Sequence, residues 1–361
     1  MQDPRNPRPP SGLAWRWAVI GLAVVGTAAA FGYAGGWLTP DRLGPKKIVD
    51  LLQANGGGAH PGYRRNHAKG ICVGGRFEAS GQLAPFSSAK LFGQGVSTPV
   101  VGRLAIPGGN PQAPDSSAPI RSFALRFDLP DGEQWRTGMN AMPVFPVSTP
   151  QAFYELNVAT APDPATGKPN PDKAKAFFGS HPETGAFLGW VKGAKPPASY
   201  VDETYLSLNA FYLRDANGQR HAVRWQVVPE TPSTGDGGPA AGDTDYLAAD
   251  LKKRLAAGPV KWHLQFVFAN DGDPVDDAAK AWPADRKTVD AGTVTIDSWQ
   301  DQADGPCRDV NYDPAILPKG MEISGDPIIV ARSAAYAESY LRRTSEEGHL
   351  PGTKAVKEEQ R

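Results

Sequence analysis

Two segments far apart in the chain carry residues whose types and spacing could do chemistry. The first, residues 64–78, contains His67 among several arginines. The second, residues 326–340, places Arg332 four positions before Tyr336. On a helix two residues at this spacing are neighbours, and a guanidinium beside a phenol favours the phenolate. Because a phenolate is one known axial ligand of haem iron, this pair is compatible with a haem site.

Taken singly, these residues say little. A tyrosine on a helix is usually a buried core residue, and His221 and His263 lie in alternating segments where a histidine is usually structural. The small residues at 68, 70, 74 and 75 would let a bulky, flat group approach a strand closely. The motifs HExxH, GxSxG, GxxxxGK[ST] and GxGxxG are absent from the sequence, which disfavours a zinc protease, a serine hydrolase and a nucleotide-binding protein.

Three motifs taken together resemble the haem catalases. They are RRNHAKG at residues 64–70, GMNAMPVF at residues 138–145, and the RxxxY pair near the C-terminal end. The resemblance covers about residues 46–345 and continues through Trp282-Pro283 and residues 312–320. Within this group the chain is similar to the small, membrane-anchored catalase-related peroxidases, which keep only the barrel and a few helices.

The resemblance implies roles for residues on both faces of a haem. His67 would lie over the distal face as the catalytic acid and base, and Asn140 would be the distal catalytic amide. Phe145 would be a distal aromatic residue near Asn140. Tyr336 would ligate the iron from the proximal side, with Arg332 against its phenolate.

The resemblance also implies the cofactor and the reaction. Arg64, Arg103 and Arg343 match positions that bind haem propionates, and the haem would be haem b. The expected function is a haem-dependent peroxidase that reduces hydrogen peroxide or organic peroxides with a small organic electron donor, through a ferryl haem. The alternatives are a true catalase, which dismutates hydrogen peroxide, and a membrane-tethered barrel that binds haem or lipid without turnover. A monomer and a dimer are both compatible with the sequence.

The chain departs from the larger catalases at several points. Ala105 stands where they usually have a serine whose hydroxyl meets the distal histidine, so we expect the imidazole of His67 to be held less firmly. Asn66 replaces a valine that packs on the haem. The long N-terminal arm and the C-terminal domain of the larger enzymes have no counterpart in this sequence, so we expect a shallower pocket that admits organic donors.

Hydrophobic alternation predicts several strands that would position these residues. Strands are expected at 67–79, 121–129, 205–213, 221–228, 261–268 and 292–299, and apolar and polar residues alternate clearly in 121–129 and 261–268. The Asn217-Gly218 pair predicts a hairpin turn between the third and fourth of these segments. Helices are expected before Gly56, at 150–160 and at 246–257. We therefore expect an α+β fold: an antiparallel β-barrel of the haem-catalase type with helical insertions and a C-terminal haem-ligand helix, preceded by one transmembrane helix.

Composition and charge exclude two classes of protein. The 361 residues include 38 Lys and Arg against 38 Asp and Glu, so the formal net charge is zero and no nucleic-acid partner is expected. Hydrophobic residues make up 40% of the chain, which is too many for a disordered protein.

The N-terminal region predicts export. Residues 17–38 contain no charged residue and would span about 33 Å as a helix, enough for the hydrocarbon core of a bilayer. Residues 1–16 carry a net charge of +2, which favours a cytoplasmic N-terminus and a catalytic domain in the periplasm. The alternative is a signal peptide cleaved after residues 28–30, which would release a soluble periplasmic protein. The expected organisation is a basic tail (1–16), an anchor (17–38), a catalase-like domain (39–345) and a disordered tail (346–361).

The chain contains only two cysteines, Cys72 and Cys307. In an exported protein they could form a disulfide, and two separate buried thiols are an equally good interpretation.

Overall fold

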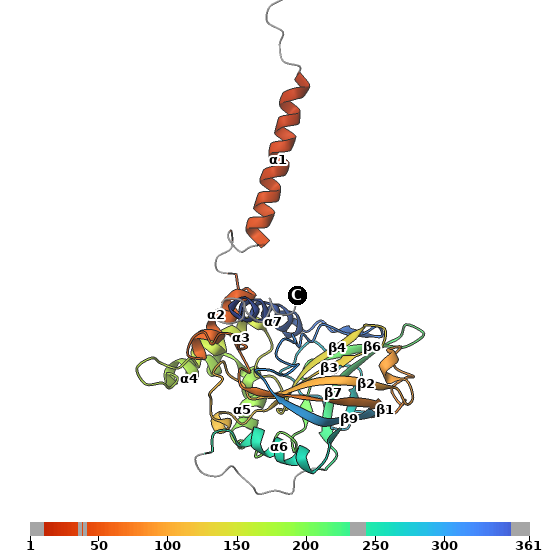
Figure 1. Cartoon of the computed structure of the whole chain (residues 1–361). Coiled ribbons are helices and arrows are strands. Elements are labelled where there is room, and N and C mark those ends of the chain that lie inside the picture. The colour runs from red at the N-terminus through yellow and green to blue at the C-terminus, as the bar shows by residue number, and fades with distance from the viewer. Residues whose placement is uncertain (1–10, 35–37, 39–41, 232–242, 348–361) are drawn as a thin grey trace, which may run out of the picture. The chain divides into compact units, whose positions relative to one another are not determined.

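The computed structural model of the chain describes residues 11–34, 38, 42–231 and 243–347. Its centre is a closed antiparallel barrel of eight strands (Figure 1). Two short strands, β6 and β10, extend the sheet beyond β7, and the pairing of β7 with β8 closes the barrel. The barrel strands are β1 (Gly70–Ala79), β2 (Ser97–Ala105), β3 (Ser122–Asp128), β4 (Gln134–Asn140), β5 (Tyr205–Leu206), β7 (Arg220–Pro229), β8 (Val260–Phe268) and β9 (Thr288–Asp301), and the extension is β6 (Phe211–Arg214) and β10 (Met321–Ile323).

Aromatic side chains fill the interior of the barrel. On β3 the inward positions are Phe123, Leu125 and Phe127, all fully buried. The ring of Phe127 stacks on that of Trp135 with centroids 4.5 Å apart, and Trp135 meets Trp225 edge to face at 5.1 Å. Because successive side chains on a strand point to opposite faces, the residues between these aromatics face outward from the barrel.

Helices cover part of the outer surface of the barrel. In Figure 1 the helices α2, α3 and α7 lie together at one side of it. Helix α3 begins where the Thr149 side chain accepts a hydrogen bond from the Ala152 amide and Pro150 occupies the first turn, two standard features of a helix start. The helices are α2 (Pro45–Asn55), α3 (Pro150–Ala159), α4 (Pro171–Ser180), α5 (Gly185–Val191), α6 (Tyr246–Ala257) and α7 (Pro327–Glu347), with 3-10 turns at Lys90–Phe92, Asp115–Ser117 and Pro182–Thr184.

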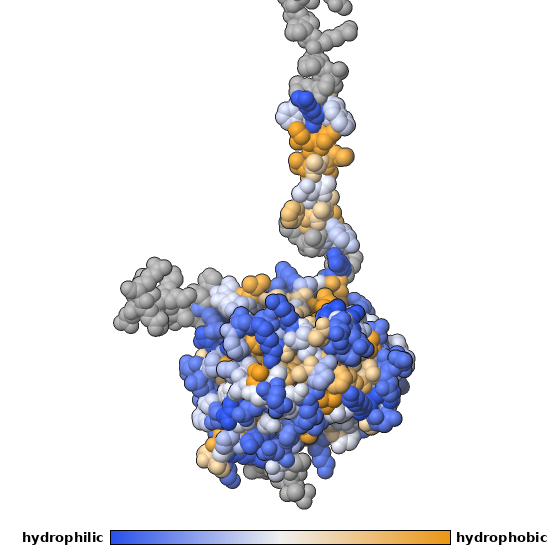
Figure 2. All heavy atoms as spheres, turned by 90° about the vertical axis from the view of Figure 1, so that its right-hand side faces the viewer, coloured by the Kyte–Doolittle hydropathy of each residue, from blue (hydrophilic) through white to orange (hydrophobic). Residues whose placement is uncertain are grey.

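The N-terminal helix α1 spans Ser11–Ala34. Its stretch Ala14–Tyr33 is long and apolar enough to cross a membrane, and such a helix could be a membrane anchor or a signal sequence. Figure 2 shows its apolar side chains exposed along its length. The chain divides into two compact units at Lys47/Ile48, whereas the sequence suggested a boundary at residue 38.

Most of the expected elements are present with shifted ends. The segment 205–213, expected as one strand, is divided into β5 and β6, and Leu208 between them has a left-handed backbone (φ 64°) that ends the strand. The Asn217-Gly218 turn between β6 and β7 is confirmed. Residues 346 and 347, expected in the tail, are the last residues of α7. The remainder of that tail, residues 1–10 of the basic tail, and residues 35–37 of the anchor lie outside the described residues.

Candidate active site

A cavity of about 1290 Å³, including the part open to solvent, lies outside the barrel wall. Its walls are the outer faces of β2, β3 and β4, the loop before β1, and the helices α2, α3 and α7. The alternation of the strands explains this position, because β3 directs Phe123 inward and the small residues Ser122 and Ala124 into the cavity. All of the site residues predicted from the sequence line this one cavity: Arg64, His67, Arg103, Asn140, Phe145, Arg332, Tyr336 and Arg343.

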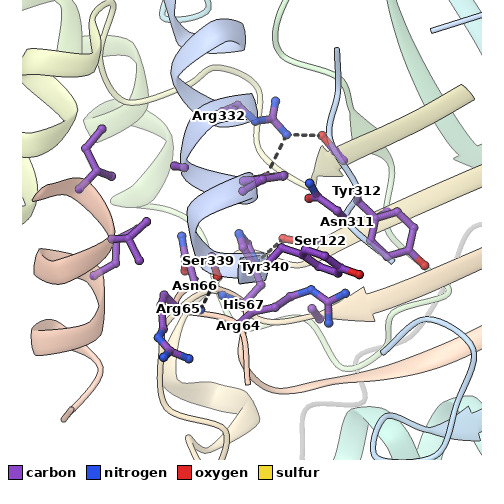
Figure 3. A pocket seen from close by; sticks show the side chains of 18 of the residues that line it. Arg64, Arg65, Asn66, His67, Ser122, Asn311, Tyr312, Arg332, Ser339 and Tyr340 are labelled. Atoms are coloured by element: carbon purple, nitrogen blue, oxygen red, sulfur yellow. Dashed lines mark hydrogen bonds between the residues drawn. The ribbon is translucent and has the colours of Figure 1, made fainter. Parts of the chain in front are cut away.

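In the cavity His67, Ser122 and Asn140 form a hydrogen-bonded row, of which Figure 3 labels His67 and Ser122. The Ser122 hydroxyl lies 3.0 Å from Nδ1 of His67. The same hydroxyl donates to Oδ1 of Asn140 at 2.6 Å. Sequence analysis missed Ser122. The alternation of residues 121–129 placed this small polar residue on the outward face of the strand, and that position could have marked it as a site residue.

The presence of this hydroxyl corrects one expectation. Ala105 was expected to leave the imidazole of His67 loosely held. In the structure Ala105 is the cross-strand partner of Ser122, so the hydroxyl comes from the neighbouring strand instead. His67 therefore has a hydroxyl partner despite the alanine.

The backbone of His67 is also unusual. Its φ is 54°, in the left-handed region that non-glycine residues rarely adopt. The Asn66 side chain supports this conformation, since its Oδ1 accepts from the His67 amide at 2.9 Å and from the Gly108 amide at 2.8 Å. Asn66 thus connects the His67 loop to the segment after β2.

The imidazole of His67 lies in an environment that disfavours its protonation. Burial, and then the positive charges of Arg103, Arg332 and Arg64, lower the pKa of His67 to about 3. The ring is therefore neutral at physiological pH. A group that accepts a proton from a substrate must be in this neutral form.

At another part of the cavity Tyr336 and Arg332 project from α7. Nη2 of Arg332 lies 3.3 Å from the Tyr336 hydroxyl and donates to the Gly138 carbonyl at 2.9 Å. A Cβ at Gly138 would lie only 3.1 Å from that Nη2, so glycine lets the Arg332 guanidinium approach the strand closely.

Two residues that sequence analysis missed hold Arg332 in place. Nη1 of Arg332 donates to Oδ1 of Asn209 at 2.6 Å, and Nδ2 of Asn209 donates to the Asp326 carboxylate at 2.8 Å. Asn209 and Asp326 are 1% exposed. The Asp326 carboxylate also accepts from the Ile328 amide at the start of α7, so this chain of contacts fixes the helix that carries Tyr336.

Three arginines meet at a third part of the cavity. Arg64 donates to the carbonyls of Cys307 at 2.9 Å and Val310 at 2.8 Å, and Arg343 donates to the carbonyl of Arg308. Nε of Arg103 donates to the Gln302 side chain at 2.8 Å.

The electrostatics of this arginine cluster favour an anionic ligand. Burial lowers the pKa of Arg103 to about 10. Burial, followed by the charges of Arg103 and Arg343, lowers the pKa of Arg64 as well. Since these guanidiniums repel one another, two carboxylates placed among them would be stabilised.

A disulfide fixes the loop whose carbonyls hold Arg64 and Arg343. Cys72 on β1 is bonded to Cys307, which settles the question that the sequence left open. Both residues are fully buried, and they pack with Val310 and Tyr312. The disulfide therefore joins the loop that contains Cys307 to strand β1 of the barrel, and the Cys307 carbonyl accepts a hydrogen bond from Arg64.

Arg65 ties the His67 loop to two of the helices that cover the cavity. It is 3% exposed, donates to Gln53 of α2 at 2.9 Å, and forms an ion pair with Glu346 of α7. Arg342 of α7 forms a second link to α2 through Asp50 at 2.7 Å.

The small residues at 68, 70, 74 and 75 were expected to let a bulky, flat group approach the strand, and the structure gives two of them a different role. A Cβ at Gly70 would meet the Arg103 guanidinium at 2.6 Å, and one at Gly75 would collide with the Thr295 carbonyl of β9. These two glycines make room for a cavity arginine and for the neighbouring strand, and none of residues 68, 70, 74 and 75 lines the cavity.

The donor set of the cavity fits haem. A phenol with a guanidinium beside it, a neutral imidazole, a cluster of arginines and apolar side chains such as Phe153 and Ile328 line the same space. The phenolate could ligate the iron, the arginines could bind the two propionates, and the apolar wall could contact the porphyrin.

Comparison with known proteins agrees with this geometry. The chain is 37% identical over 335 residues to a catalase-related peroxidase of Synechococcus elongatus, covering 91% of this chain and 97% of the relative. It is 32% identical to a catalase-related peroxidase of Mycolicibacterium paratuberculosis, covering 86% of this chain and 96% of the relative.

The solved structures show the same fold. A fungal catalase superposes with a TM-score of 0.71 at 19% identity, covering 80% of this chain and 61% of that one. Catalase A from Saccharomyces cerevisiae gives a TM-score of 0.70 at 19% identity, covering 80% and 63%. The catalase family model matches residues 61–354, and the chain belongs to the catalase family as an oxidoreductase of the peroxidase and catalase type.

Proposed function

We propose that this protein is a haem-dependent peroxidase that reduces hydrogen peroxide or organic peroxides with a small organic electron donor. The observation that carries the proposal is the single cavity that holds His67, Asn140, the arginine cluster and the Arg332–Tyr336 pair. The relatives named catalase-related peroxidases, which the chain matches over nearly their whole length, support it.

His67 would move the proton. Peroxide must lose a proton from one oxygen and gain one on the other before its O–O bond can break. A neutral imidazole can accept the first proton and return it to the second oxygen, and the low pKa of His67 keeps it neutral for this task. The amide of Asn140 could donate a hydrogen bond to the bound peroxide and polarise it.

Tyr336 and the arginines would hold the cofactor. Haem, proposed to be haem b, would supply the redox-active iron for the reaction with peroxide. Tyr336 would be its iron ligand, and Nη2 of Arg332 would lie beside that ligand, 3.3 Å from the phenol oxygen. Arg64, Arg103 and Arg343 would bind the propionates, and Phe145 would lie on the distal side.

Helix α1 would anchor the protein in the cytoplasmic membrane with the cavity on the periplasmic side. The basic residues that precede the helix in the sequence support this orientation. The Cys72–Cys307 disulfide supports an oxidising compartment. Cleavage of the helix as a signal sequence would leave the barrel in the same compartment.

The test is a His67→Ala variant compared with His263→Ala, a matched control on β8 whose Nδ1 lies 3.0 Å from the Asp290 carboxylate, outside the cavity. General acid–base help is worth about 10²–10⁴ in rate. The rate of peroxide-driven oxidation of a small aromatic donor, measured per haem, should fall by about that factor in His67→Ala. It should stay at the wild-type value in His263→Ala. Equal rates in His67→Ala and the wild type would refute the role of His67.

Dismutation of hydrogen peroxide is the second candidate function, because relatives named catalases share the fold. Oxygen evolution measured beside donor oxidation separates the two. Rapid oxygen release with no oxidation of any donor would replace the peroxidase proposal with the catalase one. A haem absorption band without donor oxidation or oxygen release would mean that the protein binds haem but catalyses neither reaction.

A further inference from the structure

The geometry points to Ser122 as a positioning residue that sets both the tautomer of His67 and the orientation of the Asn140 amide. The inference rests on the proposed function, because it concerns how the distal side chains are prepared for peroxide. None of the motifs that identify the family contains Ser122.

The number of protons on the Ser122 hydroxyl limits the hydrogen bonds that it can donate. A serine hydroxyl has one proton to donate and two lone pairs that accept. The Ser122 hydroxyl donates its proton to Oδ1 of Asn140 at 2.6 Å. Its contact with Nδ1 of His67, at 3.0 Å, must then be one in which the hydroxyl oxygen accepts. The proton of the neutral imidazole is therefore on Nδ1.

This tautomer is the one that the proposed reaction needs. With its proton on Nδ1, the ring of His67 has a lone pair on Nε2 and can act as a base there. The other tautomer would present an N–H donor at Nε2 and could not accept a proton from peroxide. Which ring nitrogen carries the proton is set by the partners of the ring. Ser122 is the side chain that contacts Nδ1, and the Ile106 backbone also interacts with the imidazole.

The same hydroxyl orients Asn140. An amide has an acceptor end and a donor end, and the hydrogen bond from Ser122 engages the acceptor end, Oδ1. The donor end, Nδ2, is then the part of the amide that can donate to a ligand in the cavity.

Strand register explains why one serine reaches both partners. Ser122 on β3 is the cross-strand partner of Asn140 on β4 and of Ala105 on β2. All three line the cavity. Directly opposed residues have Cβ atoms about 5 Å apart, which places the Ser122 hydroxyl within reach of the Asn140 amide. Ser122 is 8% exposed, so water does not easily replace its hydroxyl.

The test uses the haem-loaded full chain with Ser122→Ala and Ser122→Thr. The matched control is Ser87→Ala, since Ser87 is also a buried serine, with a hydroxyl that donates to the Gly320 carbonyl at 2.9 Å away from the cavity. Loss of a residue that orients a functional side chain typically costs about 10- to 100-fold. We expect Ser122→Ala to slow the reaction with hydrogen peroxide by that factor per haem, while Ser122→Thr and Ser87→Ala keep most of the rate.

A second readout does not depend on turnover. Hydrogen cyanide must lose its proton to bind iron as the anion, so its association rate also reports on the base. We expect that rate to fall in Ser122→Ala in parallel with the peroxide rate. A purely structural role for Ser122 would lower the haem content or the stability and leave both rates per haem unchanged. Unchanged rates in Ser122→Ala, or equal losses in Ser122→Thr, would overturn the inference.

Neutron diffraction of the deuterated wild-type protein tests the tautomer directly. We expect a deuteron on Nδ1 of His67, directed at Oγ of Ser122, and one on the hydroxyl, directed at Asn140. A deuteron on Nε2 instead would overturn the inference. This measurement also separates it from the proposed function, because it holds or fails even if the wild-type protein reduces no peroxide.

Discussion

The disulfide between Cys72 and Cys307 closes a loop of 235 residues, so it should contribute strongly to stability. In the chain-entropy description, a cross-link lowers the entropy of the unfolded chain by about 2.1 + 1.5R ln n cal/mol/K. For this loop the change is about 18 cal/mol/K, or about 5 kcal/mol at 25 °C. Since whole domains are stable by only about 5–15 kcal/mol, loss of the bond should be plainly measurable.

The assay is urea unfolding of the full chain in detergent, followed by tryptophan fluorescence. Trp135 and Trp225 are buried in the barrel and will report on its opening. We compare the oxidised wild type with the same protein kept reduced, since these two differ only in the bond. We expect the reduced form to be less stable by several kcal/mol, up to the ~5 kcal/mol of the entropy estimate.

The control is the double variant Cys72→Ala/Cys307→Ala with and without the reductant, which should unfold identically in both conditions. The reasoning is refuted if the free energies of unfolding of the oxidised and reduced wild type differ by less than ~1 kcal/mol, far below the entropy term. That result would mean that the unfolded chain keeps these two segments together without the bond, or that the bond strains the folded barrel.

Three further predictions follow from the site and the N-terminal helix. Tyr336→Phe should abolish stable haem incorporation, as measured by the haem-to-protein absorbance ratio, and full incorporation with an unchanged spectrum would remove Tyr336 as the ligand. Because protonation inactivates the base and the pKa of His67 is lowered to about 3, the rate of reaction with peroxide should stay level from about pH 8 to about pH 5; a decline centred near the ordinary histidine pKa of about 6.5 would contradict the burial argument. Protease added to intact spheroplasts should digest the barrel, and complete protection would reverse the proposed topology.

The sequence predicted the site better than it predicted the contacts within it. The motifs around His67, Asn140 and Tyr336 are local, so they can be found in one chain, and the structure brings their residues into one cavity. Their roles remain proposals. The alternation of residues 121–129 likewise predicted β3, because a strand with one apolar face shows this periodicity within a few residues.

Contacts that depend on register could not be predicted in this way. Ser122 reaches His67 only because β2, β3 and β4 pair in one particular alignment, and alternation within a strand does not define its alignment with a neighbour. The Asn209–Asp326 contact and the disulfide join residues more than 100 positions apart, so local patterns contain no information about them. Strand β5 has only two residues, too few for a recognisable pattern.

The left-handed backbone at His67 has a conformational cost that its proposed role as the base would have to outweigh. A non-glycine residue held in this region typically costs about 1–3 kcal/mol, and glycine adopts it without that cost. His67→Gly should therefore relieve local strain while it removes the imidazole. A lineage that no longer needed the reaction could gain stability by losing this side chain first, and could keep the barrel and its arginine cluster intact. A glycine at this position in a related sequence would keep this backbone conformation without the imidazole.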